Sequence, residues 1–305
     1  MAKIFFLKEL KNEEELLNED EKTYFKFIRK IISYIKLKFN ISNIEECNDD
    51  IICVLPYVLG RKNNVKKIIN NILKNNIIKD IVISKKLEEN NELNSFLQTK
   101  NINILTGRWL FKYLTYETLE YICKVKKVKI EEQEIFILVK DNSEINLQNI
   151  IMLAQKVKLL NIVTTDFNKF KKIEEFLYNN MGILIRIANN YRKTLAKAKI
   201  ILNMDFSEDE INKYLIYKKA IIINLKNRIK IYSKGFSGIN ANYYKINYIN
   251  NLEVYNSFDN NIIYESKIYK RDNFKNIRNI ILSDNIKVTA LIGEKGIINE
   301  QEYIE

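Results

Sequence analysis

Basic side chains follow three successive apolar runs in the first half of the chain. Arg61, Lys85 and Arg108 each come shortly after such a run, and Trp109 adjoins the last of them. If the runs are parallel strands, their carboxyl ends meet at one sheet edge, where open α/β folds bind ligands. A guanidinium offers two parallel N–H donors to a phosphate or carboxylate. We therefore predict an anion site that includes an exposed Arg108 head group; the alternative is an ordinary basic surface with Trp109 in the core.

A second group of polar residues follows two apolar runs in the other half. Asn189 and Arg192 come after one run, and Asn203 and Asp205 come at the end of the next. Amides, a guanidinium and a carboxylate are suited to a small polar ligand. The same residue types also cap helices and build turns, so both interpretations stay open.

Several catalytic chemistries are excluded by the composition. The 305 residues include no histidine, which removes Ser-His-Asp and Cys-His nucleophiles, histidine bases and imidazole zinc ligands. The three cysteines, Cys47, Cys53 and Cys123, form no C-x-x-C pair and are expected to be small buried apolar residues. We predict no catalytic residue, no metal site and no bound cofactor.

Short β-branched runs alternate with amphipathic stretches along most of the chain, the pattern of parallel sheets built from βαβ units. In the first half we predict strands at 3–7, 51–55, 81–83 and 102–105, and helices at 19–39, 65–73, 93–97 and 109–125. The alternation then restarts. In the second half we predict strands at 134–139, 160–163, 183–188, 200–203 and 220–224, and helices at 147–157, 167–178, 191–198 and 209–214.

The layout of residues 134–225 resembles the Rossmann cofactor domain of two-domain dehydrogenases, with the shikimate-dehydrogenase-like group as the nearest shape. The similarity is best at its end, where a short basic helix precedes the strands at 199–203 and 219–224. This resemblance implies a dinucleotide cofactor. It carries over no catalytic residue, because the substrate motifs of that group are missing from the first half.

The turn after the first strand of this region departs from the dinucleotide pattern. Residues 140–146 contain no glycine and carry Asp141 and Glu144, whereas a G-x-G-x-x-G loop lets backbone N–H groups approach the pyrophosphate. Asp166, at the position of the ribose-binding acid, is expected to cap a helix instead. We predict a degenerate nucleotide-binding fold, with NAD and NADP dissociation constants weaker than about 10 µM.

The last 80 or so residues follow a different pattern. Alternating runs at 229–232 and 243–248 suggest exposed strands. A helix is expected at 262–269 or at 274–282, and a terminal hairpin is expected at 286–298. The fold class is therefore predicted as α/β: two Rossmann-like parallel-sheet domains, at 1–127 and 128–228, with a C-terminal β/α extension at 229–305 that packs on them.

The net charge of the chain does not identify the kind of molecule that the protein binds. A net charge of +12 favours an acidic partner such as nucleic acid, but the lysines are scattered, and the abundance of Ile, Asn and Lys is typical of AT-rich coding. No apolar run reaches the length of a membrane span and the first residues do not read as a signal peptide. We expect a cytoplasmic protein without a membrane partner.

Three functions remain open on the sequence. The first is a non-catalytic scaffold that binds a small anionic ligand or a protein partner between its domains. The second is an enzyme of dehydrogenase-like architecture with unusual cofactor binding. The third, less favoured, is a nucleic-acid-binding protein, and the sequence does not settle the oligomeric state.

Overall fold

The computed structural model describes residues 4–39, 41–47, 50–56, 69–70, 72–73, 78–88, 90–188, 192–269 and 273–303. The chain divides into two compact units. The first unit comprises Met1–Thr106 and Asn250–Lys267, and the second comprises Gly107–Ile249 and Ile268–Glu305. Each unit is built on its own largely parallel sheet.

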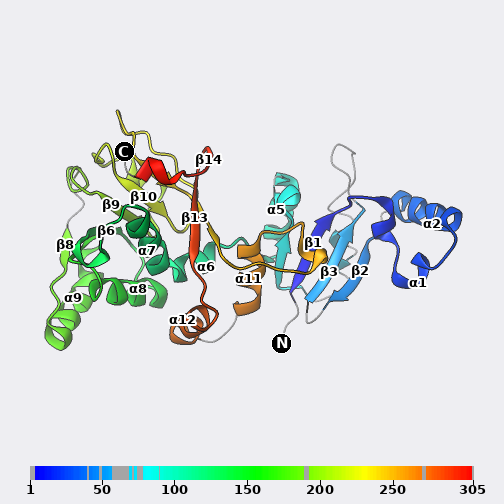
Figure 1. The fold of residues 1–305 in the computed structure, drawn as a ribbon, viewed down its shortest axis with the longest axis horizontal. Coiled ribbons are helices and arrows are strands. Elements are labelled where there is room, and N and C mark those ends of the chain that lie inside the picture. Colours follow the sequence, from blue (N-terminus) through cyan, green and yellow to red (C-terminus); the bar gives the residue numbers. More distant parts are fainter. Residues whose placement is uncertain are drawn as a thin grey trace. The chain divides into compact units, whose positions relative to one another are not determined.

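The sheet of the first unit has the strand order β2-β3-β1-β4-β5 (Figure 1). Four strands are parallel: β1 (Phe5–Glu9), β3 (Asp50–Leu55), β4 (Asp80–Ile83) and β5 (Asn103–Leu105). The fifth, β2 (Asn43–Cys47), is an antiparallel edge strand that the sequence did not predict. Its residues alternate in exposure but include Glu45 and Glu46, so it lacks the apolar run that marks a buried strand.

Both faces of this sheet are covered. Phe5, Leu7 and Ile81 face one side and pack with helix residues such as Leu87 and Leu97. On the other side the ring of Phe6 lies 5.0 Å from that of Tyr255 and 5.1 Å from that of Phe258. The described helical elements of this unit are η1 (Glu13–Leu16), α1 (Glu19–Lys22), α2 (Lys26–Lys38), α4 (Lys85–Glu88), α5 (Asn91–Thr99), η3 (Glu253–Tyr255) and most of α11 (Asn260–Ile268).

The helix predicted at 19–39 is two helices. Asn18 and Glu21 form a capping box at the start of α1, and Thr23 ends α1 through its hydroxyl, which donates to the Asp20 carbonyl. The chain then turns before α2 begins. Most of the helix predicted at 65–73 lies outside the described residues.

The sheet of the second unit has six parallel strands in the order β11-β10-β9-β6-β7-β8. The strands are β6 (Glu134–Leu138), β7 (Leu159–Val163), β8 (Arg186–Ala188), β9 (Ile200–Asn203), β10 (Ile221–Asn224) and β11 (Ile239–Ala241). Numbered along the chain and read from β8, this order is 3-2-1-4-5-6, which is that of the Rossmann fold. The predicted α/β class with Rossmann-like parallel sheets is confirmed.

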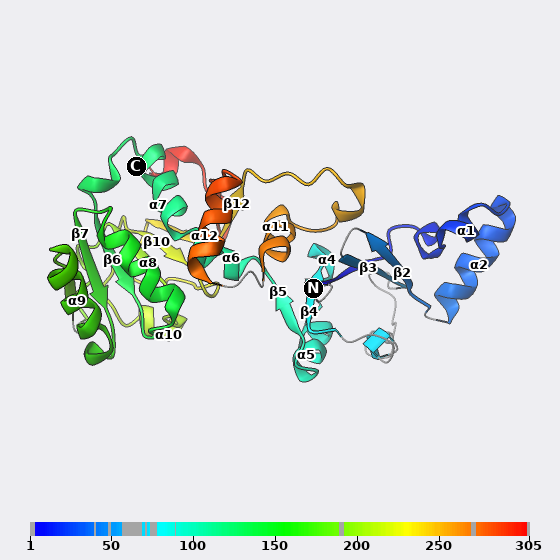
Figure 2. The ribbon, with the colours of Figure 1, turned by 90° about the horizontal axis from the view of Figure 1, so that it is seen from below.

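Helices and a small sheet complete the second unit (Figures 1 and 2). The described helical elements are α6 (Arg108–Tyr113), α7 (Thr115–Val125), η2 (Ile130–Glu132), α8 (Glu144–Ala154), α9 (Phe167–Met181), α10 (Glu208–Ile211), α12 (Phe274–Ser283) and η4 (Glu300–Tyr303). The antiparallel strands β12 (Tyr243–Ile246), β13 (Val288–Gly293) and β14 (Gly296–Ile297) include the predicted terminal hairpin. In the described part of the chain, no helix has both the length and the apolarity to cross a membrane.

The unit boundaries differ from the predicted domain limits at 127 and 228. Helices α6 and α7 belong to the second unit because they pack on α8, and α7 also packs on β13. Residues 229–305 are not a separate extension, since β11 joins the six-stranded sheet and Asn250–Lys267 belongs to the first unit. The strand predicted at 229–232 is absent, and residues 192–197 of the helix predicted at 191–198 form turns instead.

Candidate functional site

The carboxyl edge of the six-stranded sheet contains the candidate site. The strand order reverses between β6 and β9, so the chain leaves these neighbouring strands toward different sides. Rossmann folds bind their ligands at this switch point, outside the carboxyl ends of the strands. Here it is flanked by residues 139–143, which follow β6, and residues 204–207, which follow β9.

The backbone donors of the β6 turn are already occupied by a carboxylate of the chain itself. The N–H groups of Lys140 and Asp141 donate to the two oxygens of Asp205, at 2.8 and 2.7 Å. Asp205 is buried, with 8% of its surface exposed. In a dinucleotide-binding domain, N–H groups of this turn face the pyrophosphate. The Asp205 carboxylate therefore satisfies N–H groups that would face a phosphate in such a domain.

The side chain of Lys140 is also engaged. Its ammonium donates to both oxygens of Glu210, at 2.7 and 2.8 Å, and lies 5.9 Å from the centre of the Phe206 ring. Glu210 also forms the predicted capping box with Ser207 at the start of α10. Burial acts to raise the pKa of Glu210, but the hydrogen bonds from Lys140 and Ser207 outweigh it and the pKa is lowered. The β6 and β9 turns are thus joined by two carboxylates.

Asparagine amides tie together the ends of the next three strands. Asn203, at the end of β9, bonds through its amide to Phe206 and to Asn224 at the end of β10. The Asn224 amide donates in turn to the side-chain oxygens of Asn240, at 2.8 Å, and Asn242, at 3.0 Å. Asn203 was predicted as a ligand contact, but both its amide groups serve this network, which fixes the loops at the edge.

Arg108 reaches this network from the start of α6. Its guanidinium donates to the Asn224 carbonyl at 3.0 Å and lies 5.4 Å from the centre of the Tyr243 ring. Burial lowers the pKa of Arg108; Tyr243 opposes this shift and Arg228 adds to it. The predicted exposed head group is therefore half-buried, because the ring and the strand end cover it. The preceding Gly107 has a φ of 77°, which agrees with the sharp turn that a glycine permits.

Lys112 is four residues after Arg108 on α6, so both side chains leave the same face of the helix. Burial lowers the pKa of Lys112, and repulsion from Lys226 lowers it further, while Asp205 and Asp141 oppose the shift. Lys112 therefore lies near the turns of β6 and β9 and near the loop that follows β10. Among the described residues, its ammonium has no carboxylate within 4.0 Å and no hydrogen-bond partner.

The four cations at this edge are Arg108 and Lys112 from α6, with Lys226 and Arg228 from the loop after β10. None of them is in an ion pair with the described residues. Burial is the main cause of the lowered pKa values of Arg108 and Lys112, and repulsion from Arg228 and from Lys226, respectively, adds to it. A bound anion would relieve that repulsion. The described part of the chain contains no cluster of acidic and sulfur ligands suited to a metal ion.

The other predicted site residues lie elsewhere or are engaged. In the first unit, Lys85 forms an ion pair with Asp259 at 2.6 Å. Trp109 packs in an aromatic group, 4.6 Å from the Tyr113 ring and 5.2 Å from the Tyr269 ring. Arg192 is exposed in the turn before β9. Arg61 and Asn189 lie outside the described residues.

Sequence reasoning found Arg108 and Asp205 but missed Lys112, Lys226 and Arg228. The last two were open to prediction, because they follow β10 as other basic residues follow their strands. Lys112 carried a weaker signal, the spacing of four from Arg108. Asp166 is the N-cap residue of α9 as predicted, but its carboxylate pairs with Lys169 at 3.3 Å and makes no capping hydrogen bond.

Comparison with known proteins assigns no family. No family model matches the chain, and no curated protein matches it. Among solved structures, the chain is similar to the crystal structure of L-tryptophan dehydrogenase from Nostoc punctiforme, with a TM-score of 0.32 and 11% identity over 93% of this chain and 88% of that chain. A similarity at this level carries no functional argument, so the Rossmann-type architecture of the second unit rests on its own strand order.

Proposed function

We propose that the second unit binds a small anionic ligand, a phosphate or carboxylate compound, at the carboxyl edge of its sheet. The observation that carries this proposal is the group of four cations without ion-pair partners among the described residues, two of them with lowered pKa values. Clusters of ionisable groups whose pKa values are shifted by burial and by neighbouring charges are typical of binding sites. Lys112 and Arg108 are the expected direct contacts.

The same site supports a ligand other than a dinucleotide. The Asp205 carboxylate occupies the N–H groups that a pyrophosphate would need, and the β6 turn has no glycine. A dinucleotide would therefore have to displace a buried carboxylate and overcome its repulsion. The role proposed is ligand binding without redox chemistry, and it uses residues of the second unit alone.

Calorimetric titration of inorganic phosphate, pyrophosphate, succinate and NAD into the parent protein tests this proposal. We expect at least one of the three small anions to bind, and NAD to bind more weakly than about 10 µM. Arg108→Lys should weaken anion binding by about tenfold to a hundredfold, the loss of one charged hydrogen bond. No binding of any anion at millimolar concentration would contradict the proposal, and tight binding of NAD would contradict its non-redox part.

Lys112→Met is expected to abolish anion binding and to raise the free energy of unfolding by about 0.5–2 kcal/mol. The substitution removes a half-buried charge that is repelled by Lys226, while an unbranched side chain of similar length still fills the space. Chemical denaturation measures the stability and the same titration measures the binding. Lys171→Met, at an exposed lysine on α9, is the matched control and should change neither quantity.

The two readouts separate a binding residue from a structural one. A structural lysine would lower the stability when it is replaced, so a clear loss of stability in Lys112→Met contradicts the assignment. Unchanged anion binding in that variant also contradicts it.

A further inference from the structure

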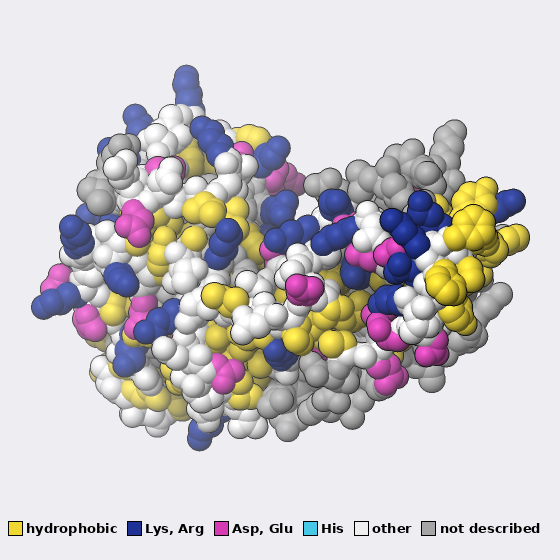
Figure 3. Space-filling view, turned by 45° about the vertical axis from the view of Figure 1, so that its right-hand side comes forward, with side chains coloured by type: hydrophobic (Ala, Val, Ile, Leu, Met, Phe, Trp, Pro, Cys, Tyr) yellow, Lys and Arg dark blue, Asp and Glu magenta, His cyan; other side chains and the backbone are white. Residues whose placement is uncertain are grey.

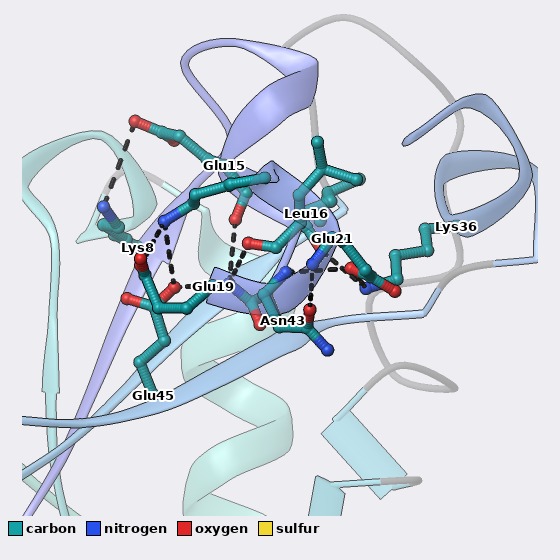
Figure 4. A network of polar contacts seen from close by, with 11 residues as sticks. Lys8, Glu15, Leu16, Glu19, Glu21, Lys36, Asn43 and Glu45 are labelled. Atoms are coloured by element: carbon teal, nitrogen blue, oxygen red, sulfur yellow. Dashed lines mark hydrogen bonds and ion pairs between the residues drawn. The ribbon is translucent and has the colours of Figure 1, made fainter. Parts of the chain in front are cut away.

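Helix α2 in the first unit turns Arg29, Ser33 and Lys36 toward its own unit, together with Leu37, which packs against the buried Leu10, Leu16 and Val54. Arg29 pairs with Glu14 at 3.7 Å, and Ser33 is buried. The Lys36 ammonium donates to the Leu16 carbonyl at 2.9 Å and pairs with Glu21 (Figure 4). Asn43 holds the same region by donating to the carbonyls of η1 and of the residue that follows it. An amphipathic helix on a soluble domain normally does the reverse and buries its apolar side.

The apolar side of α2 faces away from the unit. Residues 27, 31, 34, 35 and 38 share one face by helical spacing, and all are exposed. The exposed fractions of its large apolar residues are 74% for Phe27, 41% for Ile28, 43% for Ile31, 59% for Tyr34 and 43% for Ile35, with Phe25 at 84% and Phe39 at 67% beside the helix ends. Hydrophobic side chains gather visibly at the α2 end of the first unit (Figure 3). Large apolar side chains exposed together along one helix mark an interaction surface.

The charges of α2 are all positive. The helix has five lysines and arginines and no acidic residue. Three neighbouring acids are in ion pairs, because Glu14 and Glu21 pair with α2 itself and Glu19 pairs with Lys22 at 2.7 Å, while Asp20 is exposed. Lys26, Lys30 and Lys38 remain exposed, with no carboxylate within 4.0 Å among the described residues. The patch therefore presents free positive charge to its partner.

These charges argue against a second copy of the chain as the partner. Two α2 helices placed face to face would bring like charges together. The adjacent edge strand β2 carries Glu45 at its middle, which would oppose Glu45 of a second copy in a symmetric antiparallel pair. Lys38 lies in the apolar face itself, where a dry protein interface would bury its charge. In a lipid interface a lysine can extend its ammonium to the phosphate level.

We propose that α2 docks the protein on a membrane surface that contains anionic lipids, with its axis in the plane of the interface. Basic amphipathic helices with aromatic and aliphatic apolar faces bind in this way. The expectation of no membrane partner rested on the lack of a spanning segment, and a helix of this kind does not span the bilayer. The proposal concerns the first unit and is independent of the ligand site in the second.

Vesicle flotation of the full chain tests the proposal. The protein should float with vesicles of phosphatidylcholine containing 30% phosphatidylglycerol, and far less with phosphatidylcholine alone, and high salt should release it. The double variant Phe27→Gln with Ile31→Gln should lose flotation. Lys26→Glu with Lys30→Glu should weaken vesicle binding by about tenfold or more, since each cation near an anionic surface contributes about fivefold. These side chains are exposed, so circular dichroism and the melting temperature should stay unchanged.

Matched controls replace exposed residues of the second unit. Leu282→Gln, at a residue that is 62% exposed, and Lys275→Glu, both on α12, should bind vesicles as the parent does. The proposal is overturned if the parent fails to float with anionic vesicles, or if the α2 variants float equally well. Light scattering measures whether the parent is a dimer. If it is, and if the double variant of Phe27 and Ile31 is a monomer, the partner of α2 is a second copy of the chain and not a membrane.

Discussion

Replacing Glu117 with alanine is expected to lower the free energy of unfolding by about 3–5 kcal/mol, one of the two largest effects that we predict. The Glu117 carboxylate on α7 accepts from Arg278 on α12 at 2.7 Å, and the side chains are 6% and 10% exposed. The same guanidinium nitrogen donates to the Tyr113 carbonyl at 2.8 Å. Without Glu117 the arginine charge stays buried without a counter-ion, where α12 packs on α6 and α8 (Figure 2).

Chemical denaturation of a double-mutant series measures this effect. Glu131→Ala, at an exposed acid that follows α7, is the control and should stay within about 0.5 kcal/mol of the parent. The double variant Glu117→Leu with Arg278→Met should recover most of the loss, because it removes both buried charges and keeps apolar volume. A Glu117→Ala variant as stable as the parent would show that the pair does not hold α12 in place.

Asp205→Ala is expected to lower the free energy of unfolding by about 3–5 kcal/mol, since two hydrogen bonds to a charged acceptor are lost at about 1.5–3 kcal/mol each. The N–H groups of Lys140 and Asp141 would be left without their acceptor at the turn after β6. The change also removes a negative charge that acts on Lys112. Free N–H groups beside an unpaired cation are a good site for an anion.

Inorganic phosphate should therefore raise the melting temperature of Asp205→Ala more than that of the parent, because a ligand that binds only the folded state stabilises it. Thermal unfolding with and without phosphate makes the comparison. Asp209→Ala, at an exposed acid on α10, should show the response of the parent. An equal response of Asp205→Ala and the parent would contradict the view that this carboxylate satisfies N–H groups that could otherwise face a phosphate.

Most strands and the main helices could be predicted from the sequence, because buried parallel strands are continuous apolar runs. Ile221, Ile222 and Ile223 of β10 are examples, and all are buried. The edge strand β2 could not be found in this way, since its glutamates face solvent or ion pairs rather than a core. Strand β11, with Ile239 and Ala241, is three residues long and depends on β10 for its hydrogen bonds.

The residues of the candidate site also fall into two groups: those that the sequence indicates, and those whose contacts depend on the tertiary structure. Local sequence marks Arg108 and Asp205, because both follow apolar runs that become strands. The partner of Asp205 is the turn at Lys140, and that pairing needs β6 and β9 to be neighbours in the sheet. The position of Lys112 requires α6 to pack with the second unit rather than the first.

The sequence by itself determined the α/β class, the positions of most strands, and the absence of histidine chemistry and of a glycine-rich loop. These features depend on composition and on neighbours along the chain. Only the tertiary structure decided the strand order, the units to which α6, α7 and residues 250–267 belong, and the outward apolar face of α2. Hydrophobic periodicity shows that a helix has an apolar side, but contacts between residues far apart in the chain decide which side is buried.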